Sequence, residues 1–252
     1  MRRAPFVVLL TLLAAGPAVA QSPTPTVDPP PLKASLVACA SGATAAERFA
    51  LFTGSMPASV GTVRMAMRFD LHVRPIGGGT AWKPVKSKGF GRWERSLAGK
   101  SGFVYTKRVE RMRPAAEYRT SVRFRWYDAE GVQRESVRRT PVCAQPDQRP
   151  NLTLALVEVV PAADGTSTRY VLEVTNDGAT AAGTFDVALS GELEPVRRTV
   201  PGLPAGESAT VELVGRRRCT PDAPVSFRVD PDDVVEESNE RDNRSRWLCG
   251  GR

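Results

Sequence analysis

Apolar and polar residues alternate over several short segments of this chain, and this period of two is the feature that most restricts its fold. The segment VRMAMRFDLHV, residues 63–73, places Met65, Met67, Phe69, Leu71 and Val73 on one face. Successive side chains of a β-strand point to opposite faces, whereas a helix repeats its apolar residues three and four apart. Such segments therefore predict half-buried strands, and no segment shows a convincing helical pattern.

The same alternation recurs at intervals of about ten residues along the chain. The segments 117–127, 168–176, 184–190, 209–214 and 225–230 all carry it. The residues that we expect to be buried are Tyr118, Val122, Phe124, Trp126, Tyr170, Leu172, Val174, Phe185, Val187, Leu189, Val211, Leu213, Val225, Phe227 and Val229. Short strands joined by turns, in a chain with 21 Gly and 21 Pro, predict an all-β protein built of β-sandwiches.

The first 20 residues have the pattern of a cleaved secretory signal. Arg2 and Arg3 precede a short apolar run, and Ala18-Val19-Ala20 supplies the small residues that a signal peptidase requires. The run is too short to span a membrane, which takes about 20 apolar residues. We therefore expect an exported protein that begins at Gln21, located in the periplasm, at the cell surface or outside the cell, with no membrane span.

Export gives a meaning to the four cysteines, Cys39, Cys143, Cys219 and Cys249. An even number in an exported chain favours disulfides over metal ligands, and no pair has the C-x-x-C spacing of a zinc site. Four cysteines allow three connectivities. We predict Cys39 with Cys143 and Cys219 with Cys249, because each pair then lies within one expected domain.

Composition divides the chain into parts. A Pro-rich linker follows the signal at 21–32, and a second break at 144–151 separates a region 33–145 from a region 146–252. Region 33–145 has 21 Lys and Arg against 8 Asp and Glu, whereas region 146–252 has 12 against 18. The net charges of +13 and −6 predict two different domains.

The first region contains MRPAAEY at 112–118, followed by an alternating segment and then DAEG at 128–131. This resembles the corner of fibronectin type III domains, in which a tyrosine begins a strand and its hydroxyl bonds to the chain upstream. The resemblance implies that Tyr118 is the corner tyrosine and that residues 128–131 form a hairpin turn. A disulfide between Cys39 and Cys143 would depart from that family.

The second region contains PNLTL, VTNDGATAAGTFDVAL, VPGLPAGESATVEL and FRVDPDDVVEESNERDN in this order, from about Pro150 to Trp247. In this order and spacing the segments resemble the CARDB domain, the cell-adhesion-related domain found in bacteria. It implies an immunoglobulin-like fold in an exported or surface protein without catalytic residues. The matching positions are Asn176, Gly178, Gly202, Leu203, Gly206, Glu207, Asp230, Val235, Glu236, Asn239, Glu240 and Asn243.

The segment VDPDDVVEESNERDN, residues 229–243, holds seven carboxylates. Asp and Asn side chains favour turns, so the leading interpretation is a connection between the last two strands, folded back onto the sandwich through Val234 and Val235. The second interpretation is a calcium site, because Ca²⁺ takes six to eight oxygen ligands. Its ligands would come from Asp230, Asp232, Glu236 and Glu240. The spacing lacks the order of an EF-hand, and Arg241 and Arg244 could neutralise these carboxylates themselves.

Motifs of the common enzyme classes are absent from the sequence: there is no G-x-S-x-G, P-loop or H-E-x-x-H. The single histidine, His72, has no nearby Ser or Cys partner and falls on the polar face of its strand. We therefore expect a protein that is not an enzyme and needs no cofactor.

Arginines occupy the polar face of two expected strands, 64–74 and 119–125. If these strands are neighbours in one sheet, their outward side chains form a basic face. The arginines are Arg64, Arg68, Arg74, Arg119, Arg123 and Arg125. Like charges on adjacent strands are destabilising, and arginine suits phosphate and carboxylate groups. The other interpretations are a solvated face relieved by Asp70 and nearby Glu residues, and docking of this domain on its acidic neighbour.

These observations together predict an exported binding or adhesion protein of the bacterial envelope or exterior, with two immunoglobulin-like sandwiches. Its expected partner is an anionic envelope polymer or a surface protein, and nucleic acid is a less favoured partner. The alternative function is a structural spacer that holds a partner at the cell surface.

Overall fold

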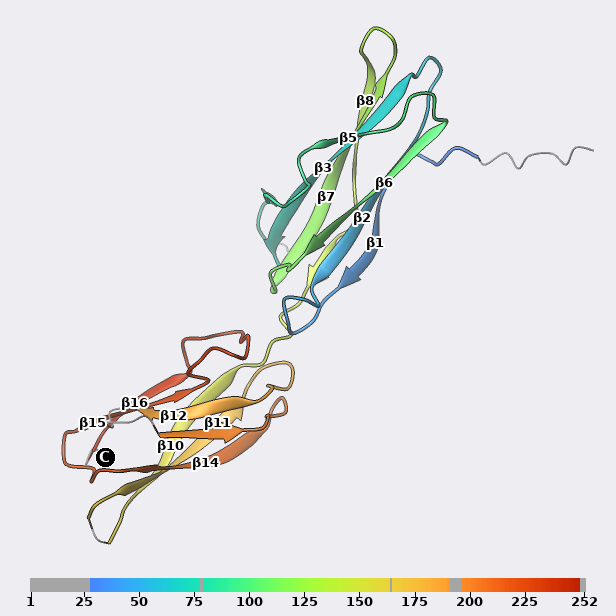
Figure 1. Cartoon of the computed structure of the whole chain (residues 1–252). Coiled ribbons are helices and arrows are strands. Elements are labelled where there is room, and N and C mark those ends of the chain that lie inside the picture. Colours follow the sequence, from blue (N-terminus) through green and yellow to red (C-terminus); the bar gives the residue numbers. More distant parts are fainter. Residues whose placement is uncertain (1–27, 78, 164, 191–195, 250–252) are drawn as a thin grey trace, which may run out of the picture.

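The computed structural model describes residues 28–77, 79–163, 165–190 and 196–249, and every regular element in these ranges is a β-strand (Figure 1). The strands form two sandwiches, so the predicted all-β fold with two immunoglobulin-like domains is confirmed. The expected signal sequence, residues 1–20, and most of the Pro-rich linker lie outside the described residues. No helix in the described ranges is long and apolar enough to cross a membrane.

The first domain packs a three-stranded sheet, in the order β1-β2-β6, against a larger sheet in the order β4-β3-β7-β8. Strand β5 pairs with β3, and β9 pairs with β7, at opposite ends of the larger sheet. The strands are β1 (Lys33–Ala40), β2 (Phe49–Pro57), β3 (Arg64–Pro75), β4 (Lys83–Pro84), β5 (Trp93–Arg95), β6 (Gly102–Glu110), β7 (Ala116–Tyr127), β8 (Val132–Arg139) and β9 (Cys143–Gln145).

The core of the first domain lies between these sheets and follows the alternation of β3 and β7. Met65, Met67 and Phe69 of β3 are at most 1% exposed, and Phe124 and Trp126 of β7 are also buried. Strand β3 runs antiparallel to β7 over its full length, so the two alternating faces coincide. The inward residues are buried as the sequence predicts, and the outward residues of both strands share the opposite face.

The predicted tyrosine corner is present. The hydroxyl of Tyr118, at the start of β7, accepts a hydrogen bond from the backbone N–H of Arg113 at 2.9 Å. At the other end of β7, Asp128 accepts bonds at 2.9 Å from the backbone N–H groups of Glu130 and Gly131, closing the hairpin to β8. These contacts confirm the local geometry that the sequence indicates for 112–131. Membership of the fibronectin type III family itself stays a prediction.

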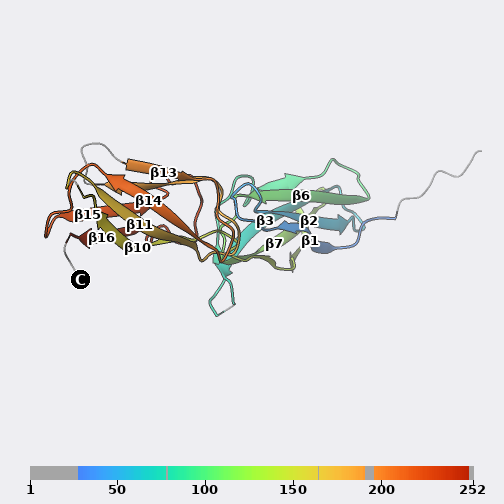
Figure 2. The ribbon, with the colours of Figure 1, turned by 90° about the horizontal axis from the view of Figure 1, so that it is seen from below.

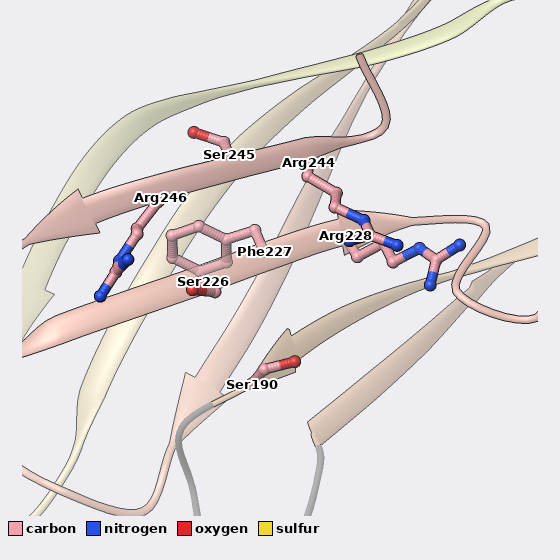
Figure 3. A pocket seen from close by; sticks show the side chains of 7 residues that line it. All are labelled: Ser190, Ser226, Phe227, Arg228, Arg244, Ser245 and Arg246. Carbon is pink, nitrogen blue, oxygen red and sulfur yellow. The ribbon is translucent and has the colours of Figure 1, made fainter. Parts of the chain in front are cut away.

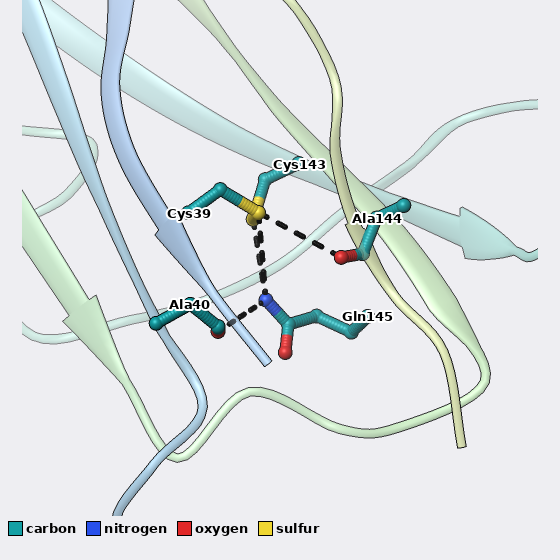
Figure 4. Close-up of a disulfide and its surroundings, with 5 residues drawn as sticks. All are labelled: Cys39, Ala40, Cys143, Ala144 and Gln145. Atoms are coloured by element: carbon teal, nitrogen blue, oxygen red, sulfur yellow. Dashed lines mark hydrogen bonds between the residues drawn. A yellow bond between two sulfur atoms is a disulfide. The ribbon is translucent and has the colours of Figure 1, made fainter. Parts of the chain in front are cut away.

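Cys39 of β1 and Cys143 of β9 form a disulfide that ties the first strand of this domain to its last (Figure 4). Their Cα atoms lie 5.5 Å apart, across 104 residues of sequence. The buried side-chain amide of Gln145 donates to the backbone carbonyl of Ala40 at 2.9 Å and lies 3.2 Å from the sulfur of Cys143. The end of the domain is therefore joined to its beginning by a covalent bond and by a hydrogen bond beside it.

The second domain packs a sheet in the order β10-β11-β14 against a sheet in the order β13-β12-β15-β16. Its core includes Tyr170, Leu172, Phe185, Leu213 and Phe227, all at most 2% exposed, as the alternation predicts. The strands are β10 (Leu152–Pro161), β11 (Thr168–Asn176), β12 (Phe185–Ser190), β13 (Val196–Val200), β14 (Ser208–Gly215), β15 (Pro224–Val229) and β16 (Arg244–Leu248).

The second predicted disulfide, Cys219 with Cys249, is also present and spans 30 residues. Cys219 lies between β14 and β15, and Cys249 directly follows β16. The bond therefore fastens the last strand of the domain to the connection between the two sheets. Both disulfides lie within a single domain, which confirms the predicted pairing.

The two sandwiches are placed end to end (Figure 1, Figure 2), joined by residues 146–151. At this junction the buried side chain of Asn176 accepts bonds from the backbone N–H groups of Asn151, at 3.1 Å, and Gly178, at 3.0 Å. A Cβ atom at Gly178 would lie 2.3 Å from the backbone nitrogen of Asn151. Glycine is required there because the incoming chain passes directly over it.

Candidate functional site

The six arginines predicted to share a face are brought together on the outer side of β3 and β7. These strands are direct neighbours, with Arg68 opposite Arg123 and Ala66 opposite Arg125. His72 lies opposite Arg119 in the same register. We call this surface the basic face and define it by Arg64, Arg68, Arg74, Arg119, Arg123 and Arg125.

Three carboxylates lie among these arginines and reduce their mutual repulsion. Asp70 accepts a hydrogen bond from Nε of Arg68 at 2.9 Å and lies 3.3 Å from Nε of Arg123. Glu117 pairs with Arg74 at 2.5 Å, and Glu135 of β8 pairs with Arg125. Six arginines against three carboxylates leave the basic face with a net positive charge.

The contacts of Asp70 leave the outer nitrogens of its two arginines available. Arg68 and Arg123 both reach Asp70 through Nε, and in the described part of the chain no hydrogen bond engages their Nη atoms. The carboxylate thus orients two guanidinium groups whose Nη atoms make no hydrogen bond within the described ranges. Such a fork can bind phosphate or carboxylate oxygens in pairs.

Two tryptophans stack against the arginines of the basic face. The guanidinium groups of Arg74 and Arg119 lie 4.5 and 4.1 Å from the ring centre of Trp82, and Arg125 lies 4.1 Å from that of Trp93. Cation–π stacking of this kind holds the plane of a guanidinium group in place. Sequence reasoning missed both tryptophans, although Lys83 follows the first and Arg92 precedes the second.

Arg119 belongs to the basic face and forms no ion pair in the described residues. Its Nε atom is buried without a hydrogen-bond partner in the described structure. Burial lowers the pKa of its guanidinium group, and the neighbouring charges of Arg139 and Arg74 lower that pKa further. An anion bound beside Arg119 would relieve this repulsion, so the local electrostatics favour anion binding.

The acidic segment of the second domain is the connection between β15 and β16, as the sequence predicts. Asp230 is fully buried, with a φ of 45°. Its carboxylate accepts bonds from the backbone N–H groups of Val234, at 3.1 Å, and Val235, at 2.9 Å. Val235 packs in the core, whereas Val234 is 66% exposed, so only one of the two valines holds the loop onto the sandwich.

A second buried carboxylate, Glu237, holds the same loop to β10. Its side chain is 1% exposed and accepts hydrogen bonds from the backbone N–H of Leu152 and, at 2.8 Å, from the amide of Asn243. Burial raises its pKa to about 7, and the charges of Glu240 and Asp230 act in the same direction. The role of this carboxylate is structural, because its oxygens accept hydrogen bonds from groups of the protein itself.

The four carboxylates considered for calcium have separate partners. Asp230 binds the backbone of its own loop, and Asp232 pairs with Arg197 of β13. Glu240 accepts from the backbone N–H of Glu237 at 3.0 Å, whereas Glu236 is directed toward the first domain. The described residues contain no group of three or more His, Cys, Asp and Glu side chains that could hold a metal ion.

Glu236 joins the two domains through Arg48, a residue that sequence reasoning did not single out. The side chain of Arg48 is 2% exposed and donates to the backbone carbonyls of Met112, at 2.8 Å, and Ala43, at 2.6 Å. Its remaining nitrogen pairs with Glu236, whose other oxygen accepts from the backbone N–H of Ala45 at 3.0 Å. One member of the acidic loop therefore fixes the first domain to the second.

Residues 149–246 match the family model for CARDB. The second domain is a CARDB domain. The CARDB domain is related to surface adhesion, and together with the two disulfides it indicates an extracytoplasmic protein. Asn176, Gly178, Asp230 and Asn243 of the CARDB pattern all lie at the buried contacts that close the end of the domain facing the first domain.

Three solved structures resemble the chain weakly. The CARDB domain of a Pyrococcus furiosus protein, crystallised in complex with di-metal ions, is 20% identical with a TM-score of 0.31, over 40% of this chain and 86% of that one. The exo-chitosanase CsxA of Amycolatopsis orientalis is 14% identical with a TM-score of 0.28, over 80% of this chain and 25% of that one. The class 5 fimbriae chaperone CfaA is 10% identical with a TM-score of 0.27, over 86% of this chain and 98% of that one.

These TM-scores are too low for any of the three structures to indicate a function for this chain. No curated protein matches the chain.

Proposed function

We propose that this protein is an exported, non-enzymatic binding protein of the bacterial envelope or exterior, and that the basic face of its first domain binds an anionic polymer. The observation that carries the proposal is the set of six arginines on two adjacent strands, several of them oriented by carboxylates and tryptophans. Teichoic acid, lipopolysaccharide, acidic glycans and DNA are polymers with the required charge.

The proposal is supported by the fact that the arginines of the basic face reduce the stability of the sheet. Like charges directly opposite one another on neighbouring strands destabilise a sheet, as with Arg68 opposite Arg123. Asp70 offsets this repulsion in part, yet it contacts both arginines through Nε alone. A sheet face with repeated donors suits a long, repetitive ligand better than a small molecule.

Changing Arg68, Arg123 and Arg125 together to serine is expected to lower the salt concentration at which the chain from Gln21 onward elutes from a polyphosphate matrix. Each arginine that neutralises a phosphate contributes about one to the slope of log affinity against log salt, so the slope should fall by about three. The measurement is elution salt, followed by binding titrations at several salt concentrations.

A second triple variant controls for the loss of net charge. Arg108, Arg111 and Arg113 are exposed and lie off the basic face, on β6 and just after it. Changing these three to serine removes the same charge and should leave elution close to that of the unchanged chain. Equal elution of the unchanged chain and the basic-face variant would contradict the proposal.

The contact of Arg48 with Glu236 favours a second function, that of a spacer holding a partner at a fixed distance from the surface. Two sandwiches placed end to end form an extended body (Figure 2), and this buried arginine limits bending at their junction. The spacer function depends on that stiffness, and it needs no ligand on the basic face.

Changing Glu236 to glutamine is expected to loosen the junction, because the ion pair is lost while the remaining bonds of Arg48 stay within the first domain. Small-angle X-ray scattering should then give a broader distribution of interatomic distances. Glu158, which is exposed on β10, provides the matched Glu→Gln control. Superimposable scattering curves for the two variants would show that the contact does not stiffen the chain.

A further inference from the structure

A second cluster of arginines lies in the CARDB domain, on the outer face of the sheet formed by β12, β15 and β16. It surrounds a hollow of about 450 Å³, lined by Ser190, Ser226, Arg228, Arg244 and Arg246 among others (Figure 3). None of these residues belongs to the acidic loop or to the basic face of the first domain. The cluster is basic although its region has a net charge of −6.

The register of the three strands explains the shape of the hollow. One cross-strand row runs from Ser190 through Ser226 to Arg246, and the next runs from Ala188 through Arg228 to Arg244. The short side chains form the floor and the long arginines stand beside it. Both rows end in an arginine on β16, the outermost strand of the sheet.

The positive charges of the arginines in this hollow have few carboxylate partners. Arg228 donates to Asp233 at 2.6 Å, but its Nε atom is buried without a hydrogen-bond partner. In the described ranges, Arg244 and Arg246 form no ion pair and no side-chain hydrogen bond, and both are exposed. Arg228 and Arg244 face each other directly, an arrangement that destabilises a sheet.

The hollow offers more hydrogen-bond donors than a bound carboxylate group could accept. Three guanidinium groups and the hydroxyls of Ser190 and Ser226 can donate hydrogen bonds. Of the three guanidinium groups, only that of Arg228 donates to a carboxylate among the described residues, the side chain of Asp233. A phosphate group offers three acceptor oxygens and up to two negative charges, against two oxygens and one charge for a carboxylate. The donor count and the charge therefore match a phosphate group better.

We propose that the hollow defined by Ser190, Ser226, Arg228, Arg244 and Arg246 is a binding site for a phosphate group, either free or carried on a small organic unit such as a sugar. Arg228 and Arg244 form its positive wall, Arg246 reaches over the serine floor, and the hydroxyls complete the donor set. This inference does not depend on the function proposed for the first domain, because it uses different residues in the other domain.

Calorimetric titration of the chain from Gln21 onward with inorganic phosphate, glucose 6-phosphate and glucuronate tests the site. We expect both phosphates to bind and glucuronate to bind at least about tenfold more weakly. Tighter binding of glucose 6-phosphate would indicate a phosphate carried on a sugar, and equal binding would indicate the free anion. Glucuronate binding as tight as that of the phosphates, or no binding of either phosphate, would overturn the proposal.

Variants locate the binding. Changing Arg244 and Arg246 together to serine should weaken phosphate binding at least about tenfold, since two of the three arginines are lost. Changing Arg169 and Arg241 to serine removes the same charge away from the hollow, and affinity should stay within about twofold. An unchanged melting temperature confirms that each variant folds.

The serine variant of the basic face serves as a second control. The triple change of Arg68, Arg123 and Arg125 should leave phosphate binding in the CARDB domain unchanged while it reduces retention on polyphosphate. The two proposals therefore fail separately: loss of phosphate binding in this triple variant, or full binding in the Arg244 and Arg246 variant, would overturn the assignment of the hollow.

Discussion

Replacing Cys39 and Cys143 together with alanine is expected to lower the free energy of unfolding of the first domain by about 4–5 kcal/mol. The bond closes a loop of 104 residues, and in the chain-entropy model a cross-link of that span removes most of its free energy from the unfolded state. Replacing Cys219 and Cys249, which span 30 residues, should cost the second domain roughly 3–4 kcal/mol. Both values approach the whole stability of a small domain.

Tryptophan fluorescence during guanidinium unfolding distinguishes the domains. Trp82, Trp93 and Trp126 lie in the first domain, and Trp247 lies in the second. Each double variant serves as the control for the other, because each should move only the transition of its own domain. A change at Cys39 and Cys143 that moved both transitions equally, or neither, would contradict the expected independence of the two disulfides.

The second domain is expected to become less stable by roughly 3 kcal/mol between pH 4.5 and about pH 7 because of Glu237. Burial raises the pKa of this carboxyl from its ordinary 4.5 to about 7. Below pH 4.5 the group is protonated in both states, and its favourable contribution is fully present. As the pH rises, the unfolded state ionises first, so the contribution is lost progressively until the folded group ionises as well.

The measurement is the free energy of unfolding across this pH range for the unchanged chain and for Glu237→Gln, whose side chain stays neutral. The difference between the two should change by roughly 3 kcal/mol. Asp147, whose pKa is lowered chiefly by its hydrogen bond to Arg149, contributes equally to both proteins and cancels. Glu158→Gln, at an exposed position, is the control. Parallel stability curves for the unchanged chain and Glu237→Gln would show that Glu237 ionises normally.

The acidic loop shows that residues of one type can have different tasks. Among its seven carboxylates, Asp230 orders the loop itself, Glu237 attaches it to β10, and Glu236 reaches the first domain. The sequence predicted the loop and its place between the last two strands correctly. It offered no way to tell these three carboxylates apart, because the tasks of Glu237 and Glu236 depend on partners 85 and 188 residues away and that of Asp230 depends on the exact turn of the backbone.

The basic face could be predicted from the sequence in part. Alternation in β3 and β7 places its six arginines on one side of their strands, and the shared face required these strands to be neighbours, as they are in the structure. Of the tryptophans that stack on the arginines, Trp82 directly precedes β4 and Trp93 begins β5, and strands of two and three residues are too short for periodicity to predict the direction of a side chain. Their positions follow from how the segment between β3 and β6 packs across the sheet.

The sequence by itself determined the all-β fold, the alternating strands β3, β7, β11, β12, β14 and β15, the buried side chains of Phe69, Phe124 and Phe227, the tyrosine corner at Tyr118 and both disulfides. Each of these depends on a local repeat of two, on a turn within a few residues, or on pairing within one domain. Only the tertiary structure decided the partner of Arg48 and the hollow around Arg228, Arg244 and Arg246. Those features need the order of strands in a sheet and the meeting of two domains, which are set by long-range packing of the whole chain.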